Sequence, residues 1–196
     1  VVFHAAGCKF IERCETDVEQ AVEDNLWTTW RMARLANEKL VFLSTDKAAA
    51  PTSVMGMTKR LAEGLVVEHG GRAVRLVNVQ QTRGNVFEAW RGQLERGEPL
   101  WVTDRAMLRY FMSLKHAVDV LLTVAEQPGG LYAVRPLQED SIWALARATN
   151  RAANRPEDLI AVVGKRPGER LTEVLCNPAH GWEPVPDHAQ LWRAVA

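Results

Sequence analysis

The sequence has no excess of charge of either sign and few cysteines. Its 196 residues carry 24 Lys and Arg against 24 Asp and Glu, so the formal net charge is zero. Generic binding to a phosphate backbone requires a basic excess, which makes nucleic acid a poor candidate partner. The cysteines Cys8, Cys14 and Cys176 show no CxxC spacing, so neither a disulfide framework nor a metal site is indicated. A reducing, cytoplasmic compartment fits this cysteine usage.

Long hydrophobic runs are also absent. No apolar stretch approaches the roughly 20 residues that a membrane-spanning helix needs, and no charged segment followed by an apolar one begins the chain. We therefore expect no membrane segment and no export signal in this stretch. The proportions of 47% hydrophobic and 24% charged residues are typical of a chain that folds around a core. At roughly 150 residues per domain, the length predicts one domain or one domain with a small addition.

Short apolar runs alternate with helical periodicity over residues 1–80. Strands are expected at 1–4, 40–44 and 74–79, and helices at 17–37 and 53–69. Thr16 and Glu19 have the spacing of a capping box for the first helix, and Gly70 ends the second. This order, with its short connections, predicts right-handed βαβ units and a parallel sheet, and therefore an α/β fold.

The pattern is weaker beyond residue 80. Helices are expected at 86–96, 115–127 and 141–154, and extended segments at 100–103, 109–113, 131–134 and 159–163. The last stretch, residues 176–196, contains Pro178, Pro184, Pro186, Trp182 and Trp192. We expect this stretch to dock on the rest of the chain as a tail.

The densest polar cluster follows the strand expected at 40–44. It reads Ser44-Thr45-Asp46-Lys47, and Lys59 follows inside the next helix. Open α/β sheets place their ligand and catalytic sites just past the carboxyl ends of strands. This cluster would therefore bring an acid, a base and a cation to the position where such a site is expected. The same residue types also occur in solvated strand-to-helix loops that have no catalytic role, and the residues alone leave that alternative open.

Residues 44–63, STDKAAAPTSVMGMTKRLAE, resemble the CapD-type nucleotide-sugar dehydratases of capsule and polysaccharide biosynthesis, which are extended short-chain dehydrogenase/reductase proteins. Three further stretches agree in order and spacing: VVFHAAGCK at 1–9, TDRAMLRYFM at 103–112 and GKRPGERLTEVL at 164–175. The resemblance implies the carboxyl-terminal part of a Rossmann-like doubly wound parallel sheet, with a small substrate-binding α/β subdomain. It assigns 1–80 to the NAD(P)-binding half, 81–175 mainly to the substrate subdomain and 176–196 to the docked tail.

The resemblance also implies an activity. Family members hold NAD or NADP, take a hydride from sugar carbon 4, eliminate water across carbons 5 and 6, and return the hydride to carbon 6. The expected substrate is a UDP-N-acetylhexosamine. In the matching positions Asp46 is the acid, Lys47 is the base at carbon 5, and Thr45 hydrogen-bonds the 4-hydroxyl. Lys59 is implied to hold the nicotinamide ribose. Met55 stands where the wider superfamily has a Tyr, and although a thioether cannot transfer a proton, Met here marks the large branch of the family.

Further positions are implied to bind the cofactor and the sugar nucleotide. For the cofactor they are Ala5, Ala6, Lys9, Asn25 and Ser44, together with Lys59. For the UDP-sugar they are Asn78, Arg83, Arg109, Arg166 and Glu169. A planar guanidinium pairs well with diphosphate oxygens, although an isolated arginine is more often a surface or ion-pair group.

The chain also departs from the family pattern. Val77 replaces a glycine, and its branched side chain would narrow the cleft; Gln80 and Gln81 follow it, and Phe10 replaces a histidine. The superfamily's GxxGxxG fingerprint does not occur. We therefore expect residue 1 to lie in mid-sheet, with the chain forming a homo-oligomer or associating with a missing amino-terminal half. Two alternatives remain: a catalytically silent nucleotide-sugar-binding relative or partner-binding scaffold, and a related sugar-nucleotide epimerase.

Overall fold

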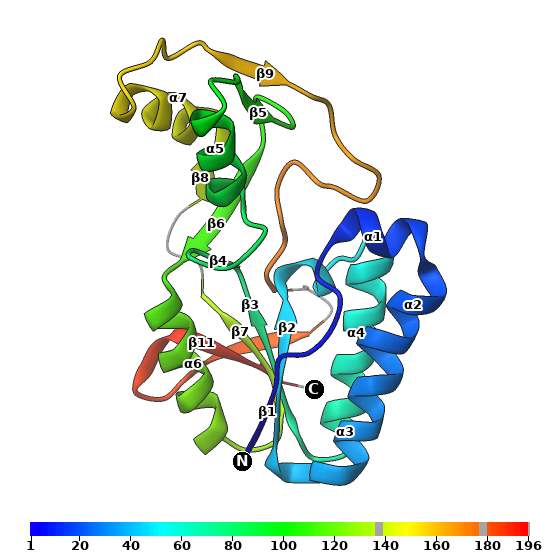
Figure 1. The fold of residues 1–196 in the computed structure, drawn as a ribbon. Helices are drawn as coiled ribbons and strands as arrows, with labels where there is room; N and C mark the ends of the chain where they lie inside the picture. The colour runs from blue at the N-terminus through cyan, green and yellow to red at the C-terminus, as the bar shows by residue number, and fades with distance from the viewer. Residues whose placement is uncertain (136–138, 177–179, 196) are drawn as a thin grey trace.

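The computed structural model describes residues 1–135, 139–176 and 180–195 (Figure 1). The largest unit is a six-stranded sheet in the order β1-β2-β3-β7-β11-β10. The strands β1 (Val2–His4), β2 (Leu40–Thr45), β3 (Arg72–Leu76) and β7 (Gly130–Val134) are parallel to one another. Strand β11 (His188–Val195) runs antiparallel to β7, and β10 (Gly181–Val185) runs antiparallel to β11. The predicted α/β fold with a parallel-dominated sheet is therefore confirmed.

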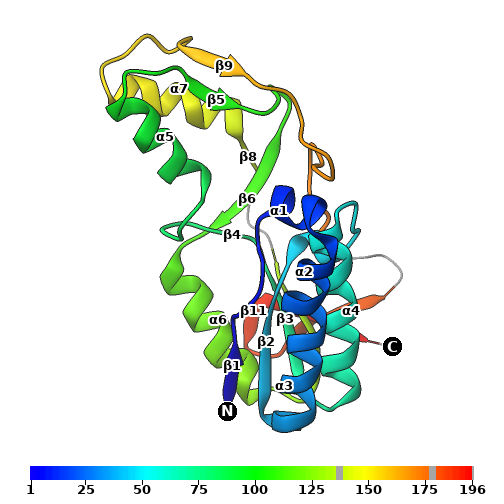
Figure 2. The ribbon, with the colours of Figure 1, turned by 45° about the vertical axis from the view of Figure 1, so that its right-hand side comes forward.

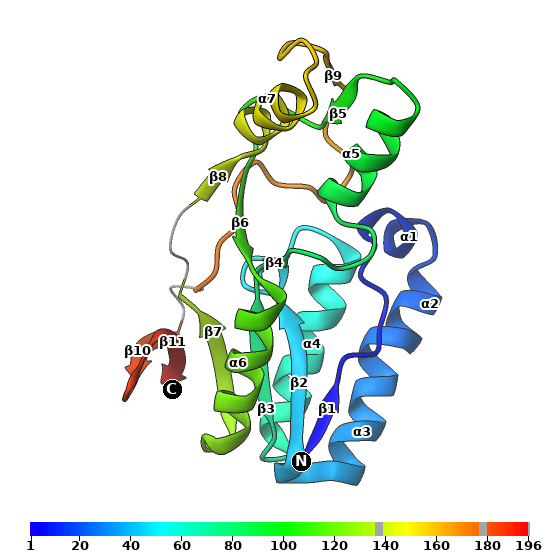
Figure 3. The ribbon, with the colours of Figure 1, turned by 60° about the vertical axis from the view of Figure 1, so that its left-hand side comes forward.

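Helices cover both faces of this sheet, as Figure 3 shows. Helices α3 (Thr28–Ala36) and α4 (Val54–Glu68) pack on one face, where Leu40 and Phe42 of β2 are fully buried. Helix α6 (Leu114–Glu126) packs on the other face, against Val41 of β2. Because successive strand residues point to opposite faces, the apolar residues 40–43 of β2 contribute to a core on each side.

The helix predicted over 17–37 is interrupted by a π-helical turn. It is formed by the contiguous elements α2 (Val18–Val22), the π-helical turn η1 (Glu23–Trp27) and α3, and a separate short helix, α1 (Ile11–Thr16), precedes it. Asp17 caps α2, because its Oδ1 accepts a hydrogen bond from the Gln20 backbone N–H at 3.0 Å. The capping box predicted at Thr16 is wrong: Thr16 is the last residue of α1, and its hydroxyl donates back into that helix.

The strand predicted over 74–79 is also divided. β3 ends at Leu76, and β4 (Asn78–Val79) pairs with β6 (Leu108–Met112), which in turn pairs with β8 (Glu139–Ser141). Val77, at the break between them, is buried in the core on the α6 face of the sheet. Its side chain therefore packs into that core instead of narrowing a cleft.

A second core lies around Trp90. It is formed by α5 (Val86–Glu95), α7 (Ile142–Ala152) and β5 (Leu100–Val102), which lie in the upper part of Figure 2, and β5 pairs with β9 (Ile160–Val162). Trp90 is 1% exposed, and its indole Nε1 donates to the Trp101 carbonyl at 2.9 Å. The indole thus ties helix α5 to strand β5.

The chain passes between the two cores more than once. Helix α6 and strand β7 come from inside the stretch 81–175 but join the large sheet, so that stretch is not one continuous unit in space. Residues 181–195 form the β10–β11 hairpin, which extends the sheet by antiparallel pairing with β7. Pro178, assigned to the tail, lies outside the described residues. Among the helices that the structure describes, none has the length and apolar character needed to cross a membrane.

Candidate active site

The loop after β2 carries the polar cluster. Thr45 ends β2, Asp46–Ala48 form a 3-10 turn, and Ser53 caps α4 by accepting a hydrogen bond from the Gly56 N–H at 3.1 Å. Gly56 has no tolerated substitute here, because a Cβ atom would lie 2.6 Å from the Lys47 carbonyl oxygen. The start of α4 is therefore packed directly against the turn that holds Asp46 and Lys47.

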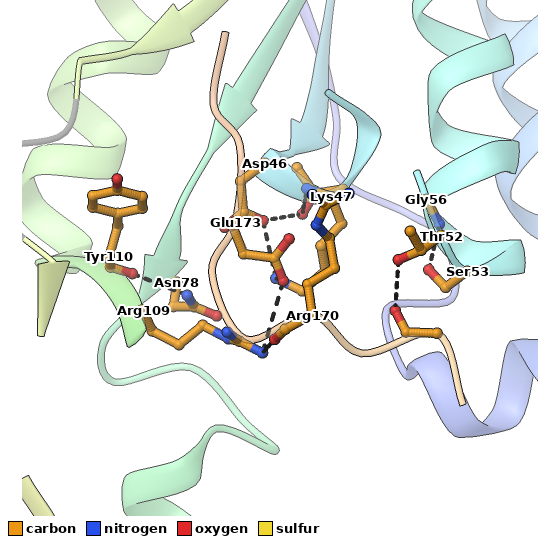
Figure 4. A network of polar contacts seen from close by, with 12 residues as sticks. Asp46, Lys47, Thr52, Ser53, Gly56, Asn78, Arg109, Tyr110, Arg170 and Glu173 are labelled. Atoms are coloured by element: carbon orange, nitrogen blue, oxygen red, sulfur yellow. Dashed lines mark hydrogen bonds and ion pairs between the residues drawn. The ribbon is translucent and has the colours of Figure 1, made fainter. Parts of the chain in front are cut away.

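Asp46 lies at the centre of this cluster and is 1% exposed (Figure 4). Its Oδ1 accepts hydrogen bonds from Thr45 Oγ1 at 2.8 Å and from Lys47 Nζ at 3.0 Å. Its Oδ2 is buried and has no hydrogen-bond partner among the described residues. One oxygen of the carboxyl group is thus held by two donors, and the other faces no donor among the described residues.

Lys47 is faced by two carboxylates. Its Nζ lies 3.0 Å from Asp46 Oδ1 and 3.6 Å from Glu173 Oε1. Burial by itself lowers the pKa of Lys47, but the charges of Asp46 and Glu173 outweigh it and hold that pKa above its ordinary value. Glu173 was not among the predicted site residues, because nothing in its sequence spacing indicates that it reaches Lys47.

Arg109 stands beside this cluster and is 8% exposed. Its guanidinium donates to the carbonyls of Leu171 at 3.0 Å and Arg170 at 2.9 Å, and lies 3.8 Å from Glu173 Oε1. The segment that contributes Glu173 therefore also fixes the orientation of Arg109 (Figure 4).

Lys59 reaches the same region from α4 and is 7% exposed. Its Nζ donates to the Leu43 carbonyl at 3.4 Å and lies 4.6 Å from the centre of the Phe42 ring. Burial lowers the pKa of Lys59 to about 8, while the carboxylate of Glu63 acts in the opposite direction. Lys59 is thus a cation that is close to losing its proton at neutral pH.

Gly7 brings Asn25 and Lys59 together. A Cβ atom on Gly7 would lie 2.6 Å from Asn25 Oδ1 and 3.2 Å from Lys59 Nζ, and its φ is +143°. Asn25 lies fully buried in the π-helical turn, a feature often found at functional sites, and its Nδ2 donates to Thr58 Oγ1 at 3.1 Å. In the part of the chain that the structure describes, Asn25 Oδ1 has no hydrogen-bond partner. The sequence analysis had not singled out Gly7.

Met55 and Ser44 are buried beside these groups. Met55 lies one turn before Lys59 on α4 and packs with Cys8 and Cys14. The Ser44 hydroxyl donates to Glu63 Oε1 at 2.6 Å, so it is engaged by α4. Ser44 therefore supports the cluster from the side of α4, and its contact with the cofactor stays a prediction.

A cleft of about 340 Å³ lies between this cluster and the second core. Six of the predicted residues line it: Lys9, Lys47, Asn78, Arg109, Arg166 and Glu169. Four of the six are cations, which suits a negatively charged ligand. Ala5 and Ala6 are exposed in the connection between β1 and α1.

Arg83 does not line this cleft. Its side chain is exposed and lines a separate hollow with Gln80 and Gln81. It meets the cleft residue Lys9 through its backbone, because the Arg83 carbonyl accepts a hydrogen bond from Lys9 Nζ. The predicted substrate contact of the Arg83 guanidinium is thus not part of the geometry described here.

The loop that carries Arg166 and Glu169 closes one side of the cleft. Glu169 Oε2 accepts from the Arg166 backbone N–H at 2.9 Å, and the Arg166 guanidinium lies 3.7 Å from Glu12 Oε2. The loop is anchored to the start of α4, since Thr52 Oγ1 donates to the Gly168 carbonyl at 2.9 Å (Figure 4). Within residues 1–135, 139–176 and 180–195, no group of His, Cys, Asp and Glu side chains could hold a metal ion.

The fold and the cleft define the class of protein. A mostly parallel sheet with helices on both faces, and a charged site past the carboxyl end of β2, is a Rossmann-type α/β protein of the short-chain dehydrogenase/reductase class. Residues 1–191 match the family described as polysaccharide biosynthesis protein, and the chain belongs to that family.

Two curated relatives show the range of the similarity. The capsular polysaccharide biosynthesis protein CapD of Staphylococcus aureus is 35% identical over 191 residues, which cover 90% of this chain and 32% of that protein. A UDP-glucose 4-epimerase of Rickettsia rickettsii is 33% identical over 189 residues, which cover 89% of this chain and 55% of that protein. The chain thus spans between about a third and just over half the length of these relatives.

Solved structures share the fold. Pen from Bacillus thuringiensis superimposes with a TM-score of 0.90 at 25% identity, over 98% of this chain and 65% of that one. DesIV, a dTDP-glucose 4,6-dehydratase from Streptomyces venezuelae solved with NAD and TYD bound, gives a TM-score of 0.79 at 18% identity, over 90% of this chain and 64% of that one. The chain is therefore related to nucleotide-sugar dehydratases and epimerases.

Proposed function

We propose that this chain carries the acid, the base and the sugar-nucleotide site of an NAD(P)-dependent 4,6-dehydratase for a UDP-N-acetylhexosamine. The observation that carries the proposal is the buried Asp46 carboxyl group, which Lys47 contacts at 3.0 Å while Oδ2 has no partner among the described residues. CapD and DesIV, described as a capsular polysaccharide biosynthesis protein and a dTDP-glucose 4,6-dehydratase, support the reaction class.

The residues around Gly7 fit a dinucleotide cofactor. Because Gly7 has no side chain, Asn25 Oδ1 and Lys59 Nζ approach its backbone to distances at which a Cβ atom would clash or crowd them. The Lys59 ammonium would donate to a ribose hydroxyl, and the exposed backbone of Ala5 and Ala6 would line the nucleotide. Bound NAD(P) would supply the acceptor for the hydride of carbon 4.

The elimination requires a neutral base and a protonated acid at the same time. Lys47 must be uncharged to accept the proton from carbon 5, and Asp46 must be protonated to release the 6-hydroxyl as water. Transfer of one proton from Lys47 Nζ to the Asp46 carboxylate converts the ion pair into that neutral pair. Desolvation of the site by bound substrate favours this transfer, because burial penalises both charges. Thr45 holds Oδ1 and would also meet the 4-hydroxyl.

The cleft supplies the groups that a UDP-sugar needs. Arg109 and Arg166 would pair with the diphosphate, and Lys9 adds a third cation. Asn78 and Glu169 would contact the sugar and the uridine ribose. The Asn78 side chain is fixed in orientation, because its Nδ2 donates a hydrogen bond to the Tyr110 carbonyl at 2.9 Å. Its Oδ1 would then accept a hydrogen bond from the ligand.

Two other functions compete with the dehydratase. A sugar-nucleotide 4-epimerase would use the same residues, and the Rickettsia relative is described as a UDP-glucose 4-epimerase. A silent nucleotide-sugar-binding relative or scaffold is the other, suggested by the departures from the family pattern at Val77, Gln80 and Gln81.

The product of the reaction distinguishes the dehydratase, the epimerase and the silent relative. Full-length protein is incubated with UDP-N-acetylglucosamine and NADP, and the products are followed by mass spectrometry and NMR. Loss of one water with a 4-keto-6-deoxy sugar supports the dehydratase. An isomer of unchanged mass indicates the epimerase. No product across several sugar nucleotides, with NADP still bound, overturns the enzyme assignment.

We further propose that two exposed apolar surfaces are covered by protein. The cover would be either a second copy of this chain in a homo-oligomer or the βα units of an amino-terminal half. Val2 and Phe3 are exposed on β1, the edge strand of the large sheet, and Leu114, Val118 and Leu122 form an exposed stripe on α6. Light scattering coupled to size exclusion tests whether the full-length protein is oligomeric. Its compartment, predicted to be the cytoplasm, is tested by cell fractionation.

A further inference from the structure

Beneath the polar cluster lies a buried ion pair that the proposed mechanism does not use. Glu63 on α4 is 1% exposed, and Arg75 on β3 is fully buried. They meet in a two-point contact, with Arg75 Nε 2.9 Å from Glu63 Oε1 and Arg75 Nη2 2.7 Å from Glu63 Oε2. A planar guanidinium fixes a carboxylate in one orientation when it binds in this way.

Further contacts hold both partners in place. Ser44 Oγ donates to Glu63 Oε1 at 2.6 Å, and Arg60 Nη1 lies 3.3 Å from Glu63 Oε2. On the other side, Arg75 Nη1 donates to the Leu175 carbonyl at 3.5 Å, and its guanidinium lies 5.7 Å from the Trp182 ring. The Glu63 carboxylate is therefore saturated with donors and cannot swing toward another cation without losing them.

Burying two charges contributes little to stability compared with apolar residues of the same volume, so such a pair calls for another explanation. Glu63 lies one helical turn after Lys59 on α4, which puts the two on the same side of the helix. Even so, the described residues form no Glu63–Lys59 ion pair, because Arg75, Arg60 and Ser44 take the carboxylate oxygens. The carboxylate is near Lys59 without occupying its hydrogen-bond donors.

We propose that Glu63, held by Arg75, is a positioning residue that keeps the buried Lys59 ammonium charged while leaving its donors available to a ligand. An anion that paired directly with Lys59 would also keep the ammonium charged, but it would occupy the hydrogen-bond donors of Lys59. In an apolar site with no anion nearby, Lys59 would lose its proton. Arg75 thus separates the electrostatic effect of Glu63 on Lys59 from a direct contact. What Lys59 binds rests on the proposed function, whereas its ionisation does not.

Other titratable groups face Lys59 from the neighbouring elements. Burial raises the pKa of the Cys14 thiol of α1 to about 12, so this thiol is neutral at physiological pH. Burial also lowers the pKa of His4 on β1, which favours the uncharged ring. Cys8 lies in the connection between β1 and α1 and has a thiol near Lys59. Glu63 is therefore the carboxylate that opposes the effect of burial on Lys59.

The test follows the ionisation of Lys59 directly. Full-length protein without cofactor or substrate is labelled with an amine-reactive acylating reagent over a pH series, and modification of Lys59 is measured by peptide mass spectrometry. Glu63→Gln is expected to move the midpoint for Lys59 to lower pH by about one unit, because an opposite charge has been removed. Glu68→Gln, an exposed carboxylate further along the same helix, is expected to leave the midpoint unchanged.

Arg75→Met gives the opposite expectation. Without Arg75 the Glu63 carboxylate is free to pair with Lys59, so the midpoint moves to higher pH and affinity for NADP falls. The double variant Glu63→Gln with Arg75→Met leaves no unpaired buried charge from this pair, and it is expected to fold and to resemble Glu63→Gln in the titration of Lys59. A merely structural role would move both single variants in the same direction.

The inference is overturned if the midpoint of Lys59 is unchanged in folded Glu63→Gln, if both single variants shift it the same way, or if the double variant restores the wild-type value. Because the titration needs no turnover, its result is independent of the product assay. A protein that forms no dehydrated sugar can still show the shift, and an active dehydratase can fail to show it.

Discussion

The Lys47 ammonium nitrogen lies 3.0 Å from Oδ1 of Asp46, and Asp46 is 1% exposed. The same nitrogen lies 3.6 Å from Glu173 Oε1, so two carboxylates stabilise one cation in a desolvated place. This arrangement keeps Lys47 protonated in the free protein and brings an acid and a base close enough to exchange a proton.

Replacement of Asp46 by Asn removes the proposed proton donor but keeps its shape. We expect kcat for formation of the 4-keto-6-deoxy product to fall by about 10²–10⁴-fold, with a smaller change in KM. Asp158→Asn, an exposed carboxylate beyond α7, serves as the matched control and is expected to keep wild-type turnover. Equal loss of turnover and of UDP binding in Asp46→Asn would instead indicate that the residue acts by holding the cleft together.

Glu173→Gln removes one of the two carboxylates that stabilise the Lys47 cation. The pKa of Lys47 is held above its ordinary value by Asp46 and Glu173, so the variant is expected to lower it. In a pH–rate profile the limb that reports deprotonation of Lys47 should then move to lower pH. Exposed Glu126→Gln is the control. A profile that keeps its shape while the whole rate drops would contradict this role for Glu173.

Gly7→Ala is expected to weaken binding of NAD or NADP. The added Cβ atom would lie 2.6 Å from Asn25 Oδ1, and the φ of +143° is unfavourable for alanine. Gly64→Ala provides the contrast, because nothing lies within 4 Å of its Cβ position inside α4, and it should stabilise the protein by about 0.5–1 kcal/mol. Calorimetric titration with the cofactor and thermal unfolding measure the two effects. Unchanged cofactor affinity in Gly7→Ala would remove Gly7 from the proposed site.

Lys59 should make the stability of the free protein depend on pH. Its pKa is lowered from 10.5 to about 8 by burial, so above about pH 8 the unfolded chain still binds the proton that the folded protein has lost. The free energy of unfolding therefore rises with pH over the window from about 8 to 10.5, at a rate approaching about 1.4 kcal/mol per pH unit from this group.

Lys59→Met lacks this contribution. We expect Lys59→Met to be more stable than the wild type below pH 8, and this difference in unfolding free energy to shrink as the pH rises. Urea denaturation over a pH series measures it. A difference that stays constant across this window would show that Lys59 is not desolvated in the free protein.

Much of the site was predictable because it is local in sequence. Thr45, Asp46 and Lys47 follow a buried strand directly, and parallel strands place their carboxyl ends at one edge of the sheet. The spacing from Lys47 to Lys59 spans one loop and the first turns of α4, which brings Lys59 back beside the turn. Local rules were sufficient for this part.

Other residues were missed because their partners are distant in the chain. Glu173 lies 126 residues after Lys47 in the chain, and only its ion pair with Lys47 identifies it as part of the site. Arg83 was expected in the cleft with Arg109, but the turn after β4 directs its side chain to a separate hollow. The capping box at Thr16 failed because a spacing of polar residues does not indicate where one helix ends and the next begins.

The sequence by itself determined the alternation of strands and helices, the buried parallel strands and the position of Asp46 and Lys47 after β2, since each depends on periodicity or on adjacent residues. Tertiary structure alone decided which charges meet: Glu173 with Lys47, and Glu63 with Arg75 but not with Lys59. The reason is that ion-pair partners are chosen by the register of β2 and β3 and by the packing of α4 on them, and both depend on contacts between segments far apart in the chain.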